Sequence, residues 1–221
     1  MLVTGASSGI GRATALRLAR RKASLVLAAR RIGALEALAA ECRHLGATTL
    51  AQATDVSDPD QVEALARATV SRFGRIDVWI NNASVGVFAP FLDTPLADFR
   101  RVLDVNAMGY VHGCRSALRV MTERGRGSII NVASIVGEVP LPYAAPYNMS
   151  KAAVLALGVT LRSELALAKR SKIHVSTVLP PTIDTPFFEH AANYSGRKIL
   201  AMPPVYKPEA VAKAIESLIG R

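Results

Sequence analysis

The fold of this chain is predicted from one stretch near its N-terminus, T-G-A-S-S-G-I-G at Thr4–Gly11. The stretch follows a short apolar run typical of a strand and precedes a helical pattern. Glycines at such a turn let the backbone curl tightly and approach a pyrophosphate, and the first N–H groups of the helix attract that anion. A plain tight turn is the alternative. We expect a phosphate-binding turn that is formed by Gly5, Ser7, Ser8, Gly9, Ile10 and Gly11.

Short β-rich runs and longer amphipathic stretches alternate along the rest of the chain. The runs expected to form strands are Met1–Thr4, Ser24–Ala29, Thr48–Ala53, Asp77–Asn81, Ser128–Val132 and His174–Leu179. The stretches expected to form helices are Ile10–Arg21, Gly33–Leu45, Asp58–Phe73, Leu96–Glu123, Tyr147–Lys169 and one that begins near Pro208. This alternation predicts an α/β fold, a single doubly wound Rossmann domain over residues 1–221. We expect a parallel sheet of about six strands with helices on both faces.

The charge distribution favours a partner that carries phosphate. The net charge is +10, and the first 35 residues hold seven basic side chains and no acid, namely Arg12, Arg17, Arg20, Arg21, Lys22, Arg30 and Arg31. Such a field attracts nucleic acids and phosphorylated cofactors alike. An arginine-rich solvated face is the simpler interpretation for most of these residues. The chain lacks a basic recognition helix and an aromatic stacking surface, so we do not expect it to bind nucleic acid.

Several kinds of protein are not expected from this sequence. Its longest apolar stretch, Ala152–Leu161, has ten residues, whereas a membrane-spanning helix needs about 20. The N-terminus has no basic region followed by an apolar block, so we expect no secretory signal and a cytoplasmic location. Cys42 and Cys114 are isolated and the four histidines are scattered. We therefore expect free thiols and no metal site.

The residues after the second predicted strand indicate which dinucleotide binds. Sites that prefer NAD(H) place a carboxylate at this strand end, where it accepts hydrogen bonds from the ribose 2′-hydroxyl. This chain has Ala29-Arg30-Arg31 there instead, and guanidinium groups pair with phosphate in bidentate fashion. The sequence thus favours NADP(H) over NAD(H), with Arg30 and Arg31 at the 2′-phosphate. Solvated loop charges are the alternative.

Two further strand ends carry polar side chains. Asp55-Val56 follows the third strand, where the carboxylate can hydrogen-bond an adenine edge and the valine can pack beneath the ring. A simple turn at Asp55 is the alternative. Asn81-Asn82-Ala83 follows the fourth strand, and its amides can tie neighbouring strands and loops together near the cofactor.

A serine and a Tyr-x-x-x-Lys pattern follow the fifth strand. Ser134 stands at the strand end, and Tyr147 and Lys151 lie four residues apart. That spacing puts both side chains on one face of a helix. Tyrosine and lysine meet at this spacing by chance in many sequences, but their position after Ser134 in this series indicates a proton-transfer pair.

These ordered motifs make the chain resemble the short-chain dehydrogenase/reductase family over essentially its whole length. The motifs are the glycine turn at Thr4–Gly11, Asp55-Val56, Asn81-Asn82-Ala83, Asn106, Ser134, Tyr147 and Lys151. The glycine spacing resembles the simple T-G-x3-G-x-G branch of the family. The resemblance implies a catalytic set made up of Asn106, Ser134, Tyr147 and Lys151.

The resemblance also implies a role for each member of this set. Tyr147 donates its proton to the developing alkoxide during carbonyl reduction, and Ser134 holds the same oxygen by a hydrogen bond. Lys151 favours the phenolate and binds the nicotinamide ribose. Asn106 anchors a water that returns the proton through Lys151.

Other parts of the cofactor and substrate site follow from the same resemblance. The further cofactor contacts that it implies are Asn82, Ala83, Tyr147, Lys151, Pro180, Ile183 and Thr185. Pro180-Pro181 stands where the family has Pro-Gly, and the second proline fixes φ and removes an N–H, so the loop geometry is expected to differ there. Residues 182–207 are expected to form a lid over the substrate. We find no further strand pattern near the C-terminus, and a homodimer through helices 96–123 and 147–169 is left open.

The sequence therefore predicts an NADP(H)-dependent oxidoreductase that interconverts a carbonyl and a secondary alcohol, with a partly apolar small-molecule substrate. A catalytically weak NADP(H)-binding regulatory protein of the same fold is the alternative. The intact Ser134, Tyr147 and Lys151 set argues against that alternative, and the short first strand and Pro181 favour it.

Overall fold

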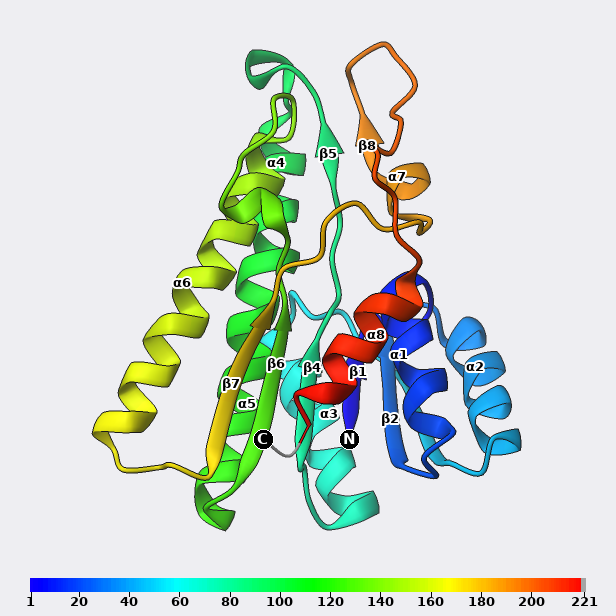
Figure 1. The fold of residues 1–221 in the computed structure, drawn as a ribbon, viewed down its shortest axis with the longest axis vertical. Helices are drawn as coiled ribbons and strands as arrows, with labels where there is room; N and C mark the ends of the chain where they lie inside the picture. Colours follow the sequence, from blue (N-terminus) through cyan, green and yellow to red (C-terminus); the bar gives the residue numbers. More distant parts are fainter. Residues whose placement is uncertain (220–221) are drawn as a thin grey trace.

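Six parallel strands form the central sheet of the computed structural model, which describes residues 1–219. The strands are β1 (Leu2–Thr4), β2 (Ser24–Ala29), β3 (Thr48–Ala53), β4 (Val78–Asn81), β6 (Gly127–Val132) and β7 (Ile173–Val178). Their order across the sheet is β3-β2-β1-β4-β6-β7 (Figure 1). The chain first builds outward from β1 to β3 and then returns to pair β4 with the free side of β1. The predicted doubly wound sheet is confirmed, and its switch point lies between β1 and β4, where such sheets bind ligands.

Helices cover both faces of this sheet. One face carries α1 (Gly9–Ala19), α2 (Ile32–His44) and α8 (Pro208–Ser217). The other carries α3 (Pro59–Phe73), α5 (Gly109–Arg124) and α6 (Ala145–Leu167). Figure 1 shows α1, α2 and α8 together on one side, with α5 and α6 on the other.

The four inner strands β1, β2, β4 and β6 are mostly apolar because both of their faces are buried, whereas the edge strands β3 and β7 are partly exposed and carry more polar residues. Successive strand residues point to opposite faces of a sheet. Leu2 therefore packs among the α3 and α5 side chains, whereas Val3 packs with Leu18 of α1 and Ile215 of α8. Strands buried on both sides are expected to show such continuous apolar runs, which is why the sequence revealed them.

The helix predicted over Leu96–Glu123 is divided in the structure. It begins as α4 (Leu96–Leu103), continues through a π-helical turn at Asp104–Met108, and then becomes α5. A π turn contains one residue more than an α turn and often marks a functional site. Here it contains the buried residue Asn106, which belongs to the predicted catalytic set.

A second, smaller sheet was missed by the sequence analysis. It pairs β5 (Val87–Phe88) with β8 (Ala192–Asn193), just after the short helix α7 (Phe187–His190). Strands of two residues have no periodicity to detect. In Figure 1 these elements lie beyond the carboxyl ends of the main strands.

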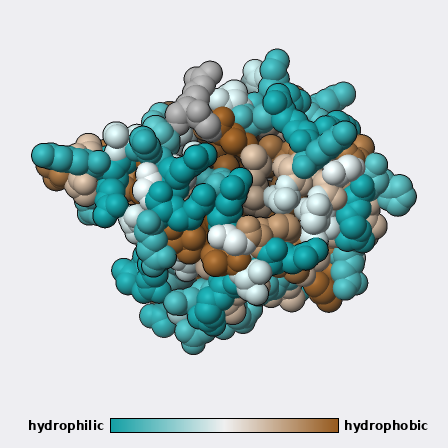
Figure 2. Space-filling model, turned by 90° about the horizontal axis from the view of Figure 1, so that it is seen from below, coloured by the Kyte–Doolittle hydropathy of each residue, from teal (hydrophilic) through white to brown (hydrophobic). Residues whose placement is uncertain are grey.

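The end of the molecule opposite the small sheet is mainly polar. Figure 2 views that end and shows hydrophilic side chains over most of it, with hydrophobic groups between them near its centre. Across residues 1–219, none of the helices combines the length and the apolar character needed to cross a membrane.

Candidate active site

A cavity of about 970 Å³ lies at the carboxyl ends of the main strands. It is bounded by the glycine turn on one side and by part of the segment 182–207 on the other. The residues predicted from separate strand ends meet in this one cavity, because parallel strands end at the same edge of the sheet. Those that line it are Gly5, Ser7, Ser8, Gly9, Ile10, Arg30, Arg31, Asp55, Val56, Asn82, Ala83, Ser134, Tyr147, Lys151, Pro180, Ile183 and Thr185.

The glycine turn leaves room for an anion at the start of α1. Gly5 has a φ of +62°, and a Cβ there would lie 2.7 Å from Cα of Ala83. Gly11 does not line the cavity but packs behind the turn, where a Cβ would lie 2.3 Å from the carbonyl oxygen of Gly5. Ser8 makes no side-chain cap to α1, and the first turn of that helix carries no acid. The turn therefore fits a pyrophosphate.

Asn82 fixes this turn to the end of β4. Its Nδ2 donates to the carbonyl oxygens of Thr4 at 3.0 Å and Gly5 at 3.1 Å. The Thr4 hydroxyl in turn accepts from the backbone N–H of Asn82 at 3.0 Å. The amide thus links two neighbouring strand ends, as the sequence analysis expected.

The other end of the cavity is rich in arginine. Arg30 and Arg31 are exposed at its edge, and within residues 1–219 neither forms an ion pair. Asp55 is held by Arg101, whose Nη2 lies 2.8 Å from Oδ2, and by the Ser57 hydroxyl at 2.7 Å. Although partial burial raises the pKa of Asp55, these hydrogen bonds lower it to about 2.

Arg101 was not singled out by the sequence analysis. It lies 46 residues from Asp55 on the helix α4, and no local motif links the two positions. Its guanidinium lines the same cavity and adds a third positive charge near the end where Arg30 and Arg31 lie. Asp55 is therefore ionised, and both of its carboxylate oxygens already accept hydrogen bonds, Oδ1 from Ser57 and Oδ2 from Arg101.

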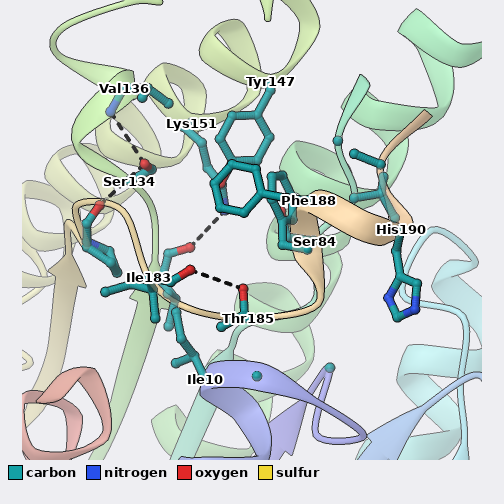
Figure 3. Close-up of a pocket in the computed structure, with 18 of the residues that line it drawn as sticks. Ile10, Ser84, Ser134, Val136, Tyr147, Lys151, Ile183, Thr185, Phe188 and His190 are labelled. Carbon is teal, nitrogen blue, oxygen red and sulfur yellow. Dashed lines mark hydrogen bonds between the residues drawn. The ribbon is translucent and has the colours of Figure 1, made fainter. Parts of the chain in front are cut away.

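Tyr147 and Lys151 project from α6 into the deep part of the cavity (Figure 3). Lys151 is 2% exposed, and its Nζ donates to the carbonyl oxygen of Val132 at 3.0 Å. That nitrogen lies 5.4 Å from the ring centroid of Tyr147. Burial lowers the pKa of Lys151 to about 7. Burial also raises the pKa of Tyr147 to about 12, against the opposing effect of the Ser134 and Ser84 hydroxyls.

Ser134 lies at the end of β6 and is 8% exposed. Its hydroxyl donates to the carbonyl oxygen of Pro180 at 3.4 Å and accepts from the N–H of Val136 at 3.4 Å. Both distances are long for hydrogen bonds, so the hydroxyl is held weakly. Pro180 therefore contacts the site through its carbonyl group. Ile183 and Thr185 follow on the same loop, and the Thr185 hydroxyl donates to the Ile183 carbonyl at 3.5 Å.

Asn106 lies behind the cavity rather than in its lining. The fully buried side chain accepts from the N–H of Val85 and donates to its carbonyl, both at 2.8 Å. Its Nδ2 also donates to the Ser150 hydroxyl at 3.1 Å, and Ser150 donates to the carbonyl oxygen of Tyr147 at 2.7 Å. Asn106 thus ties the loop between β4 and β5 to the turn of α6 that carries Tyr147.

Aromatic side chains form the wall of the cavity that faces Tyr147 of α6. The ring centroid of Phe187 lies 5.0 Å from that of Tyr147 and 5.5 Å from that of Phe188. Phe88 of the small sheet lies 6.2 Å from Phe188. Phe187 and Phe188 belong to the segment 182–207, whose aromatic residues the sequence already suggested as contacts for a partly apolar substrate or as packing of the lid onto the core. Their contact with Phe88 depends on α7 and on the pairing of β5 with β8, for which the sequence gave no signal.

Comparison with known proteins agrees with this architecture. The profile described as short chain dehydrogenase matches residues 1–194. The uncharacterized oxidoreductase YxnA of Bacillus subtilis (strain 168) is 36% identical over 217 residues, which are 97% of this chain and 61% of YxnA. The cis-4-hydroxycyclohexanecarboxylate dehydrogenase of Sinomonas cyclohexanicum is 36% identical over 221 residues, which are 98% of this chain and 87% of that enzyme. The chain thus spans less than two thirds of the length of YxnA.

A solved structure gives the same result. An alcohol dehydrogenase from the archaeon Thermococcus sibiricus, complexed with 5-hydroxy-NADP, superimposes with a TM-score of 0.87 at 28% identity and covers 100% of this chain and 89% of that chain. The sequence and structural matches extend over nearly the whole of residues 1–221. The chain therefore belongs to the short-chain dehydrogenase/reductase family of oxidoreductases, a family that implies a nicotinamide cofactor.

Proposed function

We propose that this protein is an NADP(H)-dependent oxidoreductase that interconverts a carbonyl and a secondary alcohol, with Tyr147 as its general acid and base. The main support is the buried pair on α6. A tyrosine and a lysine share one face of that helix, the amine lies 5.4 Å from the ring, and both side chains line the cavity beside Ser134. Burial of an amine costs several kcal/mol, and the retention of Tyr147 beside it supports proton transfer over cofactor binding alone.

The cavity fits the cofactor that the family implies. The uncapped N-terminus of α1 and the glycine turn suit its pyrophosphate, and we assign the exposed Arg30 and Arg31 to the 2′-phosphate of NADP(H). The similar alcohol dehydrogenase was solved with an NADP analogue. When bound, the nicotinamide supplies or accepts the hydride.

The protein's own residues would handle the proton. Burial raises the pKa of Tyr147 to about 12, so the phenol keeps its proton at neutral pH and can donate it to a carbonyl oxygen that becomes an alkoxide. Ser134 is free to turn from its 3.4 Å bond with Pro180 and donate to the same oxygen. A protonated Lys151 stabilises the phenolate that remains.

Asn106 has a different contribution from the one first expected. Its side chain is already committed to Val85 and Ser150. We therefore assign it to positioning Tyr147, and the water that was predicted beside it stays a prediction.

We further propose an apolar carbonyl or alcohol as the substrate and residues 182–207 as a lid. The support is the aromatic cluster of Phe88, Phe187 and Phe188, two of which lie in that segment. Apolar walls with few polar groups are typical of sites for small, largely apolar ligands. Exposed apolar residues on α4 and α6, such as Leu96 and Leu167, support a homodimer through these helices.

The test is NADPH oxidation with a panel of ketones, aldehydes and quinones, using Tyr147→Phe as the control variant. We expect turnover in the natural chain and a loss of about 1,000-fold or more in the variant, because general acid catalysis contributes about 10²–10⁴-fold. NADPH affinity should change little. An active Tyr147→Phe variant would refute the acid role. Tight NADPH binding without turnover of any carbonyl would favour the regulatory alternative.

A further inference from the structure

Arg101 is a cavity residue to which the proposed function gives no role. It lies in the last turn of α4, just before the π-helical turn, and lines the same cavity as Asp55. Its guanidinium bridges two residues of the turn that follows β3. Nη2 donates to Oδ2 of Asp55 at 2.8 Å, and Nη1 donates to the Ser57 hydroxyl at 2.7 Å. A planar guanidinium that donates to two partners at once holds both of them in one orientation.

Ser57 completes a closed set of hydrogen bonds around the carboxylate of Asp55. Its backbone N–H donates to Oδ1 at 3.0 Å, and its hydroxyl donates to the same oxygen at 2.7 Å. An ionised carboxylate offers about four acceptor positions, two on each oxygen. Both positions of Oδ1 are therefore filled, whereas Oδ2 accepts from Arg101 and from no second donor among residues 1–219. One acceptor position is left, and it belongs to the oxygen that Arg101 orients.

The backbone of this turn is held without Arg101. The N–H of Asp55 donates to Oε1 of Gln61 at 2.9 Å. Val56 packs against Gly109, where a Cβ would lie 2.8 Å from Cγ2 of the valine. Removal of the Arg101 guanidinium should therefore release the carboxylate of Asp55, while the turn itself and the side chain of Val56 keep their places.

We propose that Arg101 is a positioning residue that makes the site selective for adenine in the dinucleotide. This inference rests on the proposed function and on the expected contact between Asp55 and the adenine edge. The 6-amino group of adenine is a hydrogen-bond donor, and the remaining position on Oδ2 of Asp55 takes one donor. Because Arg101 fixes that oxygen, a base that presents an acceptor in place of the amine meets an oxygen that cannot turn away. Such a repulsive contact is an effective source of specificity.

The experiment compares two dinucleotides by fluorescence titration of the natural chain and of Arg101→Met. One is NADPH, and the other is its hypoxanthine analogue, in which a carbonyl oxygen replaces the 6-amino group of adenine. The quantity measured is the dissociation constant of the analogue divided by that of NADPH. We expect a ratio of about 10 in the natural chain, because the analogue loses one charge-assisted hydrogen bond. In Arg101→Met the ratio should fall to about 2 or less, because the carboxylate can then turn away from the acceptor.

The ratio separates this role from two simpler ones. If Arg101 bound a phosphate of the cofactor, or only stabilised the fold, both constants would rise together and the ratio would not change. Arg100→Met removes a neighbouring charge outside the cavity. Arg119→Met removes an ion pair outside the cavity, in which Nη1 lies 2.9 Å from Oε2 of Glu63. Both controls should keep the natural ratio. If Arg101→Met does not fold, Ser57→Ala opens the same bridge at its other end and should also lower the ratio.

Failure of this inference can be told apart from failure of the proposed function. An unchanged ratio in Arg101→Met, or equal binding of both dinucleotides by the natural chain, would overturn the role of Arg101 alone. A ratio that falls as far in Arg119→Met would overturn it as well. The expected ratios without turnover of any carbonyl would support the role of Arg101 and overturn the oxidoreductase proposal. A natural chain that binds neither dinucleotide would overturn both.

Discussion

Replacing Lys151 with methionine should stabilise the folded protein while it abolishes turnover. Burial lowers the pKa of Lys151 from 10.5 to about 7, so folding must desolvate an ammonium or remove its proton. At about 1.4 kcal/mol per unit of pKa, this disfavours the folded state by roughly 4 kcal/mol at pH 7. Methionine carries no charge and therefore avoids this cost.

The loss of the lysine contacts offsets only part of that gain. The Val132 carbonyl loses its bond from Nζ at 3.0 Å but keeps a second donor, the Tyr110 hydroxyl at 2.8 Å. No buried acceptor is left without a partner, so the loss amounts to one hydrogen bond, about 1 kcal/mol. The flexible methionine side chain fills most of the vacated space. We expect a net stabilisation of about 3 kcal/mol at pH 7.

Urea unfolding measures this difference. The single tryptophan, Trp79, is fully buried and reports unfolding by fluorescence. Between pH 7 and 10.5 the unfolded chain binds more protons at Lys151 than the folded chain does, so the natural protein gains stability as the pH rises. Lys151→Met lacks this gain, and the two stabilities should converge near pH 10. A variant that is less stable at pH 7, or a gap that does not narrow with pH, would refute the reasoning.

Two other substitutions test the cofactor and substrate assignments. Arg30→Ala should raise the NADPH dissociation constant about 10-fold and the NADH dissociation constant less than about 2-fold, because a charge-assisted bond to phosphate contributes roughly 1.5–3 kcal/mol. Fluorescence titrations measure both constants, and equal weakening of both cofactors would contradict the 2′-phosphate assignment. Arg20→Ala, at a residue outside the cavity, is the control. Phe187→Ala should raise the KM for the best carbonyl of the panel about 10-fold and leave NADPH affinity unchanged, because the lost ring buries apolar area worth about 1.5–3 kcal/mol. The control is Phe91→Ala, at a residue that is 69% exposed and lies outside the cavity, and it should change neither value. An unchanged KM in Phe187→Ala would show that this ring does not contact the substrate.

The sequence was sufficient to predict a strand, helix or binding turn wherever the pattern that marks it is local or periodic. Strands such as β1 and β2 were predicted correctly because burial on both faces makes nearly every residue apolar. The turn at Thr4–Gly11 predicted a dinucleotide site, since the glycine spacing between a strand and a helix is a local pattern, although Gly5 and Gly9 approach Ala83 and Thr185 only in the folded chain. The convergence of the strand-end residues in one cavity was also foreseeable, because parallel strands share one carboxyl edge.

Tertiary structure alone decided the contacts between residues that are far apart in the sequence. Asp55 accepts a hydrogen bond from Arg101, 46 residues away, and Asn106 forms two hydrogen bonds with the backbone of Val85, 21 residues away. The chemistry of each residue type was readable from the sequence, but its partners were not. The sequence determined the family, the sheet and the Tyr147–Lys151 pair. The structure determined that Asn106 supports the site from behind and that Arg101 holds Asp55, because burial and hydrogen-bond partners exist only once distant segments are packed together.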